Sequence, residues 1–217
     1  SHSQTPSNLI PLAPLYLRLA HSHSLPKPNS HLLQSLKESP QKFLSTHEID
    51  LSRSYFGARG IFPVVDLVRR LPHITHLNLS QNNLDNNSVR YLVHRLRDHP
   101  GLSQVDLSGN VEVSLGGADA LLEWIEGGSG DATRFEVVDE AFSGSATLHK
   151  ATSDVLIAQS HQQSGGPFRG NPRLREIYLD GTNVHEKFRV RIQEALMRNK
   201  LREAREARER GGVPQKR

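Results

Sequence analysis

Few side chains in this sequence have the types and spacing that catalysis or metal binding requires. His73 and His76 have two residues between them, but no third ligand is near, and at the start of a strand their side chains would diverge. The run Gly127-Gly-Ser-Gly-Asp-Ala-Thr133 lacks the Gly-Lys-Ser/Thr ending of a phosphate-binding loop. His21 and His23 flank an expected turn, without the elbow or oxyanion motif of a Ser-His-Asp site. We therefore expect no enzymatic activity, no metal and no cofactor.

Carboxylates that could pair with a basic partner alternate with apolar residues in several short segments. Successive side chains of a strand point to opposite faces, so apolar residues facing inward place their neighbours in solvent. The outward set is Glu48, Asp50, Ser52, His76, Asn78, Ser80, Gln104, Asp106, Ser108, Arg134, Glu136, Val138, Glu176, Tyr178 and Asp180. Six of these residues are acidic and one is an arginine, so this surface would attract a basic segment and repel nucleic acid.

Tyr178 is the strongest single candidate in the outward set. An aromatic ring flanked by two carboxylates, here Glu176 and Asp180, can hold the stem and head of a Lys or Arg. We predict that a partner protein binds at Glu48, Asp50, His76, Asn78, Asp106, Glu136, Glu176, Tyr178 and Asp180. The alternative is that these are only solvated strand residues.

The segments that carry these residues belong to a repeated unit. Ile74-x-x-Leu77-x-Leu79-x-x-Asn82 and Leu102-x-x-Val105-x-Leu107-x-x-Asn110 share their apolar spacing and their asparagine at a distance of 28 residues. A fixed period of this size is typical of repeat folds. Asn82 and Asn110 follow the strands where the chain must turn, and their amides can bond the free backbone groups of neighbouring turns. A stripe of helical spacing completes the unit, formed by Val89, Leu92, Val93 and Leu96.

Three further units, one before and two after this pair, have a similar order of strand, turn and helix. The third helix carries Trp124 off its apolar stripe, where we expect it to pack against the adjacent unit, with a role as partner anchor as the alternative. The fourth unit is degenerate, and an insert loop at 164–170 follows it. The strands are expected at Ile49-x-Leu51, Leu77-x-Leu79, Val105-x-Leu107, Phe135-x-Val137 and Ile177-x-Leu179.

The segment Ile74 to Leu84 resembles the leucine-rich repeat, L-x-x-L-x-L-x-x-N-x-L, at every position if Ile is allowed for Leu. The period is similar to that of the ribonuclease-inhibitor class. This resemblance implies an α/β solenoid of about five repeats, with short parallel strands on the concave face and helices on the convex face. The lead-in, Tyr16-Leu-Arg-Leu, Lys27-Pro-Asn-Ser and Leu32-Leu-x-x-Leu36, resembles the helical entry of leucine-rich-repeat proteins from cilia, flagella and centrosomes.

That second resemblance implies a cellular setting. It favours a non-enzymatic scaffold or adaptor in a large assembly, a ciliary or flagellar axoneme, with tubulin or axonemal proteins as partners and a location in the cytoplasm, at the cytoskeleton. The expected division of the chain is a disordered tail at 1–8, a helical cap at 9–42, the repeat domain at 43–197 and a basic helical extension at 198–217. No apolar run reaches the length of about 18 residues that a membrane span requires.

The net charge of +4 is concentrated at the C-terminus, where residues 186–217 hold 11 Lys/Arg and 5 Asp/Glu. We expect this helix to contact an acidic surface such as tubulin or RNA, or else to serve as a solubilising tail. Nucleic acid is expected to bind only here. The basic residues concerned are Arg198, Lys200, Arg202, Arg205 and Arg208.

Two other functions stay open. Residues 1–37 contain no Asp or Glu, as in a mitochondrial presequence, although five prolines argue against one amphipathic helix. The first alternative is therefore a mitochondrial or ribosome-associated assembly protein that contacts RNA through its basic helix. The second is a soluble regulator that inhibits an enzyme through its acidic face, as ribonuclease inhibitors do. The absence of cysteine excludes thiol catalysis and a disulfide framework.

Overall fold

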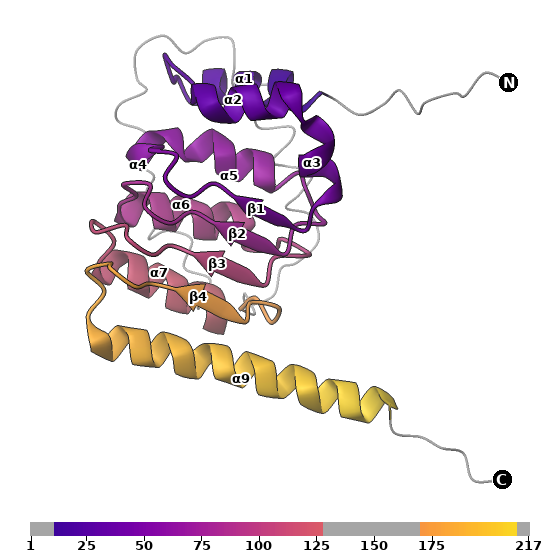
Figure 1. Cartoon of the computed structure of the whole chain (residues 1–217). Coiled ribbons are helices and arrows are strands. Elements are labelled where there is room, and N and C mark those ends of the chain that lie inside the picture. The colour runs from indigo at the N-terminus through magenta and orange to yellow at the C-terminus, as the bar shows by residue number, and fades with distance from the viewer. Residues whose placement is uncertain (1–10, 128–169, 212–217) are drawn as a thin grey trace, which may run out of the picture. The chain divides into compact units, whose positions relative to one another are not determined.

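Four short parallel strands form a single sheet in the computed structural model, which describes residues 11–127 and 170–211. The strands are β1 (Glu48–Asp50), β2 (His76–Asn78), β3 (Gln104–Asp106) and β4 (Glu176–Tyr178), and they lie side by side in this order (Figure 1). The register pairs Ile49 with Leu77, Leu77 with Val105 and Val105 with Ile177. The predicted α/β class with parallel strands is confirmed.

The sheet has four described strands rather than the five expected from the sequence. β3 and β4 pair directly, although Val105 and Ile177 are far apart in the sequence. A strand was expected between β3 and β4 at Phe135 and Val137. These two residues lie outside the described residues, as do the loop at 164–169 and both chain ends. The direct pairing extends into the following turn, where Gly109 N–H donates to Asp180 C=O at 2.6 Å. No strand therefore separates β3 from β4.

A ladder of side-chain amides joins the turns that follow the strands. Asn82 and Asn110 are completely buried. The Asn110 Oδ1 accepts from the N–H groups of Asn82 and Leu84, and its Nδ2 donates to the carbonyls of Leu79 and Leu107. The Asn82 Oδ1 accepts the N–H of the preceding turn in the same way. Each amide satisfies backbone groups that a turn inside the core would otherwise leave unpaired.

The turns also share their backbone conformation. Arg53, Gln81, Gly109 and Gly181 occupy equivalent positions, and each has a φ between 53° and 71°. At Gly109 a side chain is also excluded by space, because a Cβ there would lie 2.7 Å from the Gln81 Cγ. The same left-handed bend thus recurs along the sheet.

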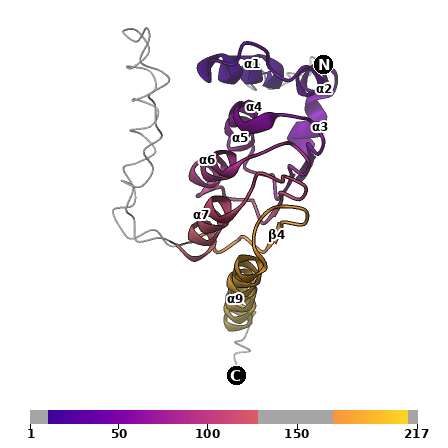
Figure 2. The ribbon, with the colours of Figure 1, turned by 90° about the vertical axis from the view of Figure 1, so that its left-hand side faces the viewer.

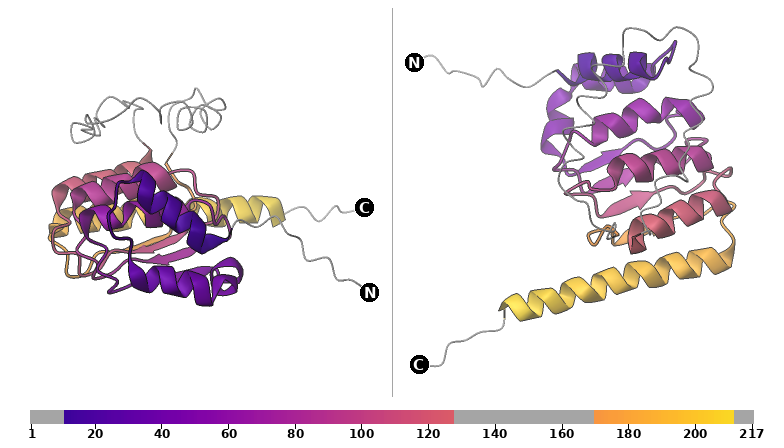
Figure 3. Two further views of the ribbon diagram at one scale, coloured as in Figure 1. Left: turned by 90° about the horizontal axis from the view of Figure 1, so that it is seen from above. Right: turned by 180° about the vertical axis from the view of Figure 1, so that it is seen from behind.

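Helices cover one face of the sheet, as the views from the side and from behind show (Figures 2 and 3). On this face lie α4 (Gly57–Gly60), α5 (Phe62–Val68), α6 (Asn86–Leu96) and α7 (Leu115–Glu126). The apolar stripes of α5, α6 and α7 and the central residues of the strands form one core, in which Val89, Leu92, Leu96 and Trp124 have no exposed surface. Trp124 therefore packs inside the unit and does not act as an exposed anchor.

Further helices lie at the two ends of the sheet (Figure 1). At the β1 end are α1 (Leu12–Ser22), α2 (Ser30–Glu38) and α3 (Pro40–Ser45), which extends the helical segment beyond the boundary expected at residue 42. Asn29 caps α2 by accepting the Leu32 N–H at 2.8 Å. At the β4 end lies α9 (Glu186–Gly211), whose Ile192 and Leu196 are buried. No helix in the described ranges is long and apolar enough to cross a membrane.

Candidate functional site

The outward side chains of the strands form rows across the face of the sheet that the helices leave open. The strand pairing places Glu48, His76, Gln104 and Glu176 in one row, and Asp50, Asn78, Asp106 and Tyr178 in the next. All of these residues are exposed or half-buried, whereas the residue between each pair along a strand is buried. We call this surface the strand face.

In the second row, three predicted partner residues serve their own chain. One side-chain oxygen of Asp50, Asn78 and Asp106 accepts the backbone N–H two residues further on, at 2.9, 3.0 and 2.8 Å. These bonds start the turns that lead to the asparagine ladder. Ser80 is only 9% exposed, contrary to expectation, and its hydroxyl donates to the Asn78 Oδ1 at 2.8 Å. These side chains therefore hold the turns, and the groups left open to a partner are the second carboxylate oxygens of Asp50 and Asp106 and the Nδ2 of Asn78.

Tyr178 and Glu176 form a pair that the sequence did not predict. The Tyr178 hydroxyl donates to the Glu176 Oε2 at 2.5 Å, and Lys200 from α9 contacts the Glu176 Oε1 at 3.1 Å. Hydrogen bonds from Tyr178 and Lys200 hold the pKa of Glu176 below its ordinary value, and the same carboxylate raises the pKa of Tyr178. Glu176 therefore already carries a cation from its own chain. The open part of this predicted hot spot is the ring of Tyr178, which is 39% exposed.

The remaining carboxylates of the strand face are more open. The Asp180 side chain is 90% exposed, with the Arg189 guanidinium at 3.8 Å, and Glu48 is exposed at the opposite end of the sheet. Glu136 lies outside the described residues. The described face thus offers acidic groups at both ends, an aromatic ring near one end and polar groups between them.

The basic residues of α9 divide into two groups. Arg198 and Lys200 are paired with the chain's own carboxylates, Arg198 with Glu126 at 2.5 Å and Lys200 with Glu176. Arg202 donates to the Asn199 Oδ1 at 3.1 Å, while Arg205 pairs with Glu209 one turn further along the helix. Arg208 is exposed. The first half of this predicted contact helix therefore attaches to the sheet, and the second half carries the solvent-facing arginines.

A polar cluster on the helix-covered side escaped the sequence interpretation. The Asp66 carboxylate accepts from the Arg95 Nε at 2.6 Å and the Tyr91 hydroxyl at 3.0 Å, and it lies 2.9 Å from the His23 Nε2. Burial alone would raise the pKa of Asp66, but its bonds to His23 and Arg95 outweigh burial and lower it. Burial and the adjacent carboxylate raise the pKa of Tyr91. We call these four residues the Asp66 cluster.

The Asp66 cluster joins three helices. His23 follows α1, Asp66 lies in α5, and Tyr91 and Arg95 lie in α6. The ring of Phe62 stacks on Tyr91 at 4.2 Å between centroids. One signal in the sequence could have revealed the cluster: Asp66 interrupts the apolar run Phe62-Pro-Val-Val-Asp-Leu-Val68, and a carboxylate buried in such a run needs partners. The cluster therefore links α1, α5 and α6 through one buried carboxylate.

The histidines considered as metal ligands have other partners. The His73 Nε2 lies 3.0 Å from the Phe43 carbonyl, and the His76 Nδ1 lies 2.7 Å from the Thr75 hydroxyl. Within the described ranges no group of three or more potential ligands is placed to hold a metal ion. A comparison with models of protein families and with curated proteins finds no match to this chain.

Proposed function

We propose that this chain is a leucine-rich-repeat protein of the ribonuclease-inhibitor-like class and serves as a non-enzymatic scaffold that binds another protein on its strand face. The 28-residue register between β1, β2 and β3, the buried amide ladder and the recurring left-handed turn support this assignment. Helices on one face and strands on the other leave the strand face free for a partner.

The observation that carries the function is the alignment of outward side chains in rows across four strands. A row of this kind presents a broad, preformed surface, since every strand fixes its outward side chains. Glu48, Asp106 and Asp180 give it a negative charge, and the ring of Tyr178 adds an apolar contact. Such a surface suits a partner segment that carries Lys or Arg.

Cross-linking in the native assembly tests this proposal. A reagent that joins carboxylates to lysines should link Glu48, Asp106 and Asp180 to lysines of one partner. Charge reversal at Glu48→Lys with Asp180→Lys should reduce recovery of that partner by at least about tenfold, because two favourable contacts become repulsive. The matched control reverses Asp98 and Asp119, two exposed acids away from the strands. An equal loss with the control pair would contradict the proposal.

The location in an axoneme is proposed on the resemblance of the helical lead-in alone. Imaging a tagged full-length copy in a ciliated or flagellated cell tests it, and organelle staining without ciliary signal would favour the mitochondrial alternative. The pairing of Arg198 and Lys200 with carboxylates of the same chain favours a protein partner over RNA, since those two cations are already engaged.

A further inference from the structure

The last turn of the sheet has a backbone N–H that no other group accepts. In the earlier turns, the N–H at the equivalent position donates to a carbonyl of the next turn: Arg53 to Ser80 at 3.0 Å, Gln81 to Ser108 at 2.8 Å and Gly109 to Asp180 at 2.6 Å. Gly181 holds this position after β4, which is the last strand of the described sheet. Its N–H donates to no acceptor among the described residues.

Helix α9 covers this end of the sheet with donors rather than acceptors. Asn199 and Gln193 donate to carbonyls in and before β4 at 3.1 and 3.4 Å. The Arg189 guanidinium donates to two carbonyls after β4, each at 2.9 Å. No group in the described part of α9 accepts the Gly181 N–H, and Gly181 is exposed. The nitrogen of Gly181 is therefore open to reaction.

The carboxylate that precedes this nitrogen is held only loosely. The Asp180 side chain is 90% exposed, and the Arg189 guanidinium lies 3.8 Å from its Oδ1, which is too far for a hydrogen bond. Asp180 is also the only Asp or Asn in the sequence that is followed by glycine. Because glycine has no Cβ, the carboxyl carbon of the preceding side chain can approach its nitrogen without steric hindrance.

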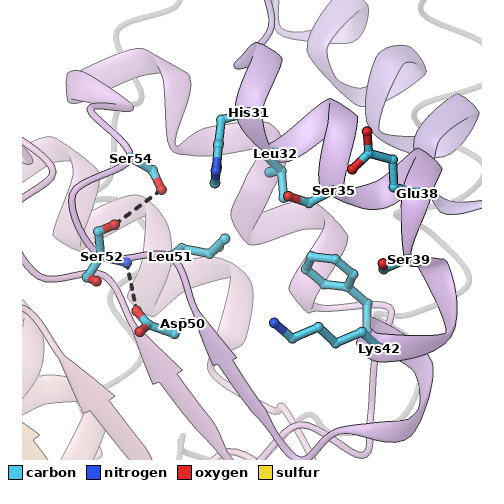
Figure 4. A pocket seen from close by; sticks show the side chains of 11 residues that line it. His31, Leu32, Ser35, Glu38, Ser39, Lys42, Asp50, Leu51, Ser52 and Ser54 are labelled. Atoms are coloured by element: carbon cyan, nitrogen blue, oxygen red, sulfur yellow. Dashed lines mark hydrogen bonds between the residues drawn. The ribbon is translucent and has the colours of Figure 1, made fainter.

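Two other aspartates of the strand face lack this combination. Asp50 lines a cavity between α2, α3 and the end of β1, and its carboxylate accepts the N–H two residues further on at 2.9 Å (Figure 4). The Asp106 carboxylate does the same at 2.8 Å. Each is followed by a leucine whose N–H donates to the next strand, at 2.9 Å for Leu51 and 3.0 Å for Leu107. At both sites the carboxylate and the following nitrogen are therefore engaged in other bonds.

We propose that Asp180 is a site of spontaneous isomerisation to isoaspartate. When the Asp180 carboxyl group carries a proton, the Gly181 nitrogen bonds to its Cγ, and one carboxyl oxygen leaves as water with the proton that the nitrogen gives up. The product is a cyclic imide. Water then cleaves one of the two C–N bonds of the ring: cleavage at Cγ restores aspartate, and cleavage at the main-chain carbonyl carbon gives isoaspartate. The reaction needs no reagent other than water.

Isomerisation would change the last turn while keeping its charge. The main chain would run through the former side chain and gain one methylene, and the former main-chain carbonyl of Asp180 would become a free carboxylate. That carbonyl accepts the Gly109 N–H at 2.6 Å, so the bond between the last two turns would be lost or would have to form with the new carboxylate. Asp180 belongs to the strand face, but its isomerisation does not depend on the function proposed for that face.

The test follows isoaspartate in the full chain during incubation at neutral pH and body temperature, beside a sample unfolded in guanidinium chloride. Peptide mapping with electron-transfer fragmentation distinguishes isoaspartate from aspartate at Asp50, Asp106 and Asp180 in the same digest. The ratio of the folded rate to the unfolded rate removes the effect of neighbouring side chains and leaves the protection that the fold gives each site. Asp180→Glu is the matched variant, because it keeps the charge but its longer side chain cannot form the same ring.

We expect isoaspartate to form at Asp180 in the folded chain at a rate within about threefold of that in the unfolded chain. At Asp50 and Asp106 the folded chain should react at least about tenfold more slowly than the unfolded chain, because hydrogen bonds of the carboxylate and of the following N–H must break first. Asp180→Glu should abolish the product at this position and leave the other two sites unchanged. Isoaspartate at Asp180 in the unfolded chain alone, or equal protection of all three sites, would overturn the proposal.

Discussion

At the β1 end of the sheet, α1 is held by apolar packing and by the buried carboxylate of Asp66, whereas at the β4 end α9 is held by apolar packing, amide bonds and ion pairs at the surface. Asp66 is 7% exposed, while Glu126, which pairs with Arg198, is 33% exposed. The first attachment places a charge out of water, so each of its partners is needed. The second distributes its contacts over many groups, so the loss of any one of them should cost less than the loss of Asp66.

The difference shows two ways in which the end of one sheet is covered. A last strand exposes backbone groups and an apolar layer that must be covered. α9 achieves this directly, since Asn199 and Gln193 reach the carbonyls of the β4 edge. At the other end, the Asp66 cluster fixes α1 to α5 and α6. The predictions below remove one contact at a time from each end.

The largest effect is expected from Asp66→Ala. Without the carboxylate, the guanidinium of Arg95 and the hydroxyl of Tyr91 lose their shared acceptor inside the protein. Removing one partner of a buried ion pair costs about 3–5 kcal/mol, and the 22% exposure of Arg95 places this case at the lower end. Denaturant unfolding followed by circular dichroism measures the loss.

The control for Asp66→Ala is Asp98→Ala, which removes an exposed acid and should change the free energy of unfolding by less than about 0.5 kcal/mol. Replacing Asp66 and Arg95 together by Leu and Met should recover much of the loss, because no unpaired charge is then left. Equal effects of Asp66→Ala and Asp98→Ala on the free energy of unfolding would show that the cluster does not stabilise the contacts between these helices.

The same cluster should make stability depend on pH. The pKa of Asp66 is lowered in the folded state from an ordinary value of 3.8, so its ionised form is favoured by folding. Its contribution is therefore complete well above pH 3.8 and is lost as the pH falls through the folded-state pKa. Melting temperatures of wild type and Asp66→Asn between pH 7 and 3 test this, and the difference between them should shrink towards low pH.

If the melting temperatures of wild type and Asp66→Asn changed in parallel with pH, Asp66 would not be the source of the pH dependence. Glu126→Gln, which removes an acid from the other end, serves as the control. The melting temperature of this variant should change with pH as that of wild type does, since the Glu126 pairs are exposed and screened by solvent.

The sequence predicted the middle of the sheet better than its ends. The register of Ile49, Leu77 and Val105 and the buried amides of Asn82 and Asn110 follow from a period that the residue types repeat. The contacts that close the ends join residues without periodic equivalents. His23 meets Asp66 across 43 positions, and Asn199 meets Leu174 across 25. The period of the repeated unit therefore does not predict these pairs.

The same reasoning explains what the sequence could not show about the candidate site. The phase of the strands identified which side chains point outward, but it could not reveal which of them their own chain would use. Asp50 and Asp106 hold turns, and Glu176 receives Lys200 from a helix that only the folded chain brings near. Charge counted along the sequence therefore overstates the charge that is open to a partner.

At the β4 end, Asn199→Ala should have an intermediate effect. The Asn199 Nδ2 donates to the carbonyls of Asn171 and Leu174, and the residue is buried. Two buried carbonyls would lose their donor, which costs about 1–3 kcal/mol. Gln193→Ala removes a longer bond of 3.4 Å from an exposed residue and should cost less than about 0.5 kcal/mol. Urea unfolding compares the pair, and a reversed order would show that the β4 edge does not depend on Asn199.

The smallest effect is expected from the surface ion pairs of α9. Glu126→Gln removes the acceptor of both Arg191 and Arg198, whose contacts are 3.7 and 2.5 Å long. Exposed pairs of this kind contribute about 0.2–1 kcal/mol, and salt screens them. The difference from wild type should therefore decrease between 0.05 and about 0.5 M salt, whereas the difference caused by Asp66→Ala should persist, because its partners are shielded from solvent. A salt-sensitive Asp66→Ala or a salt-insensitive Glu126→Gln would remove the contrast between the two ends.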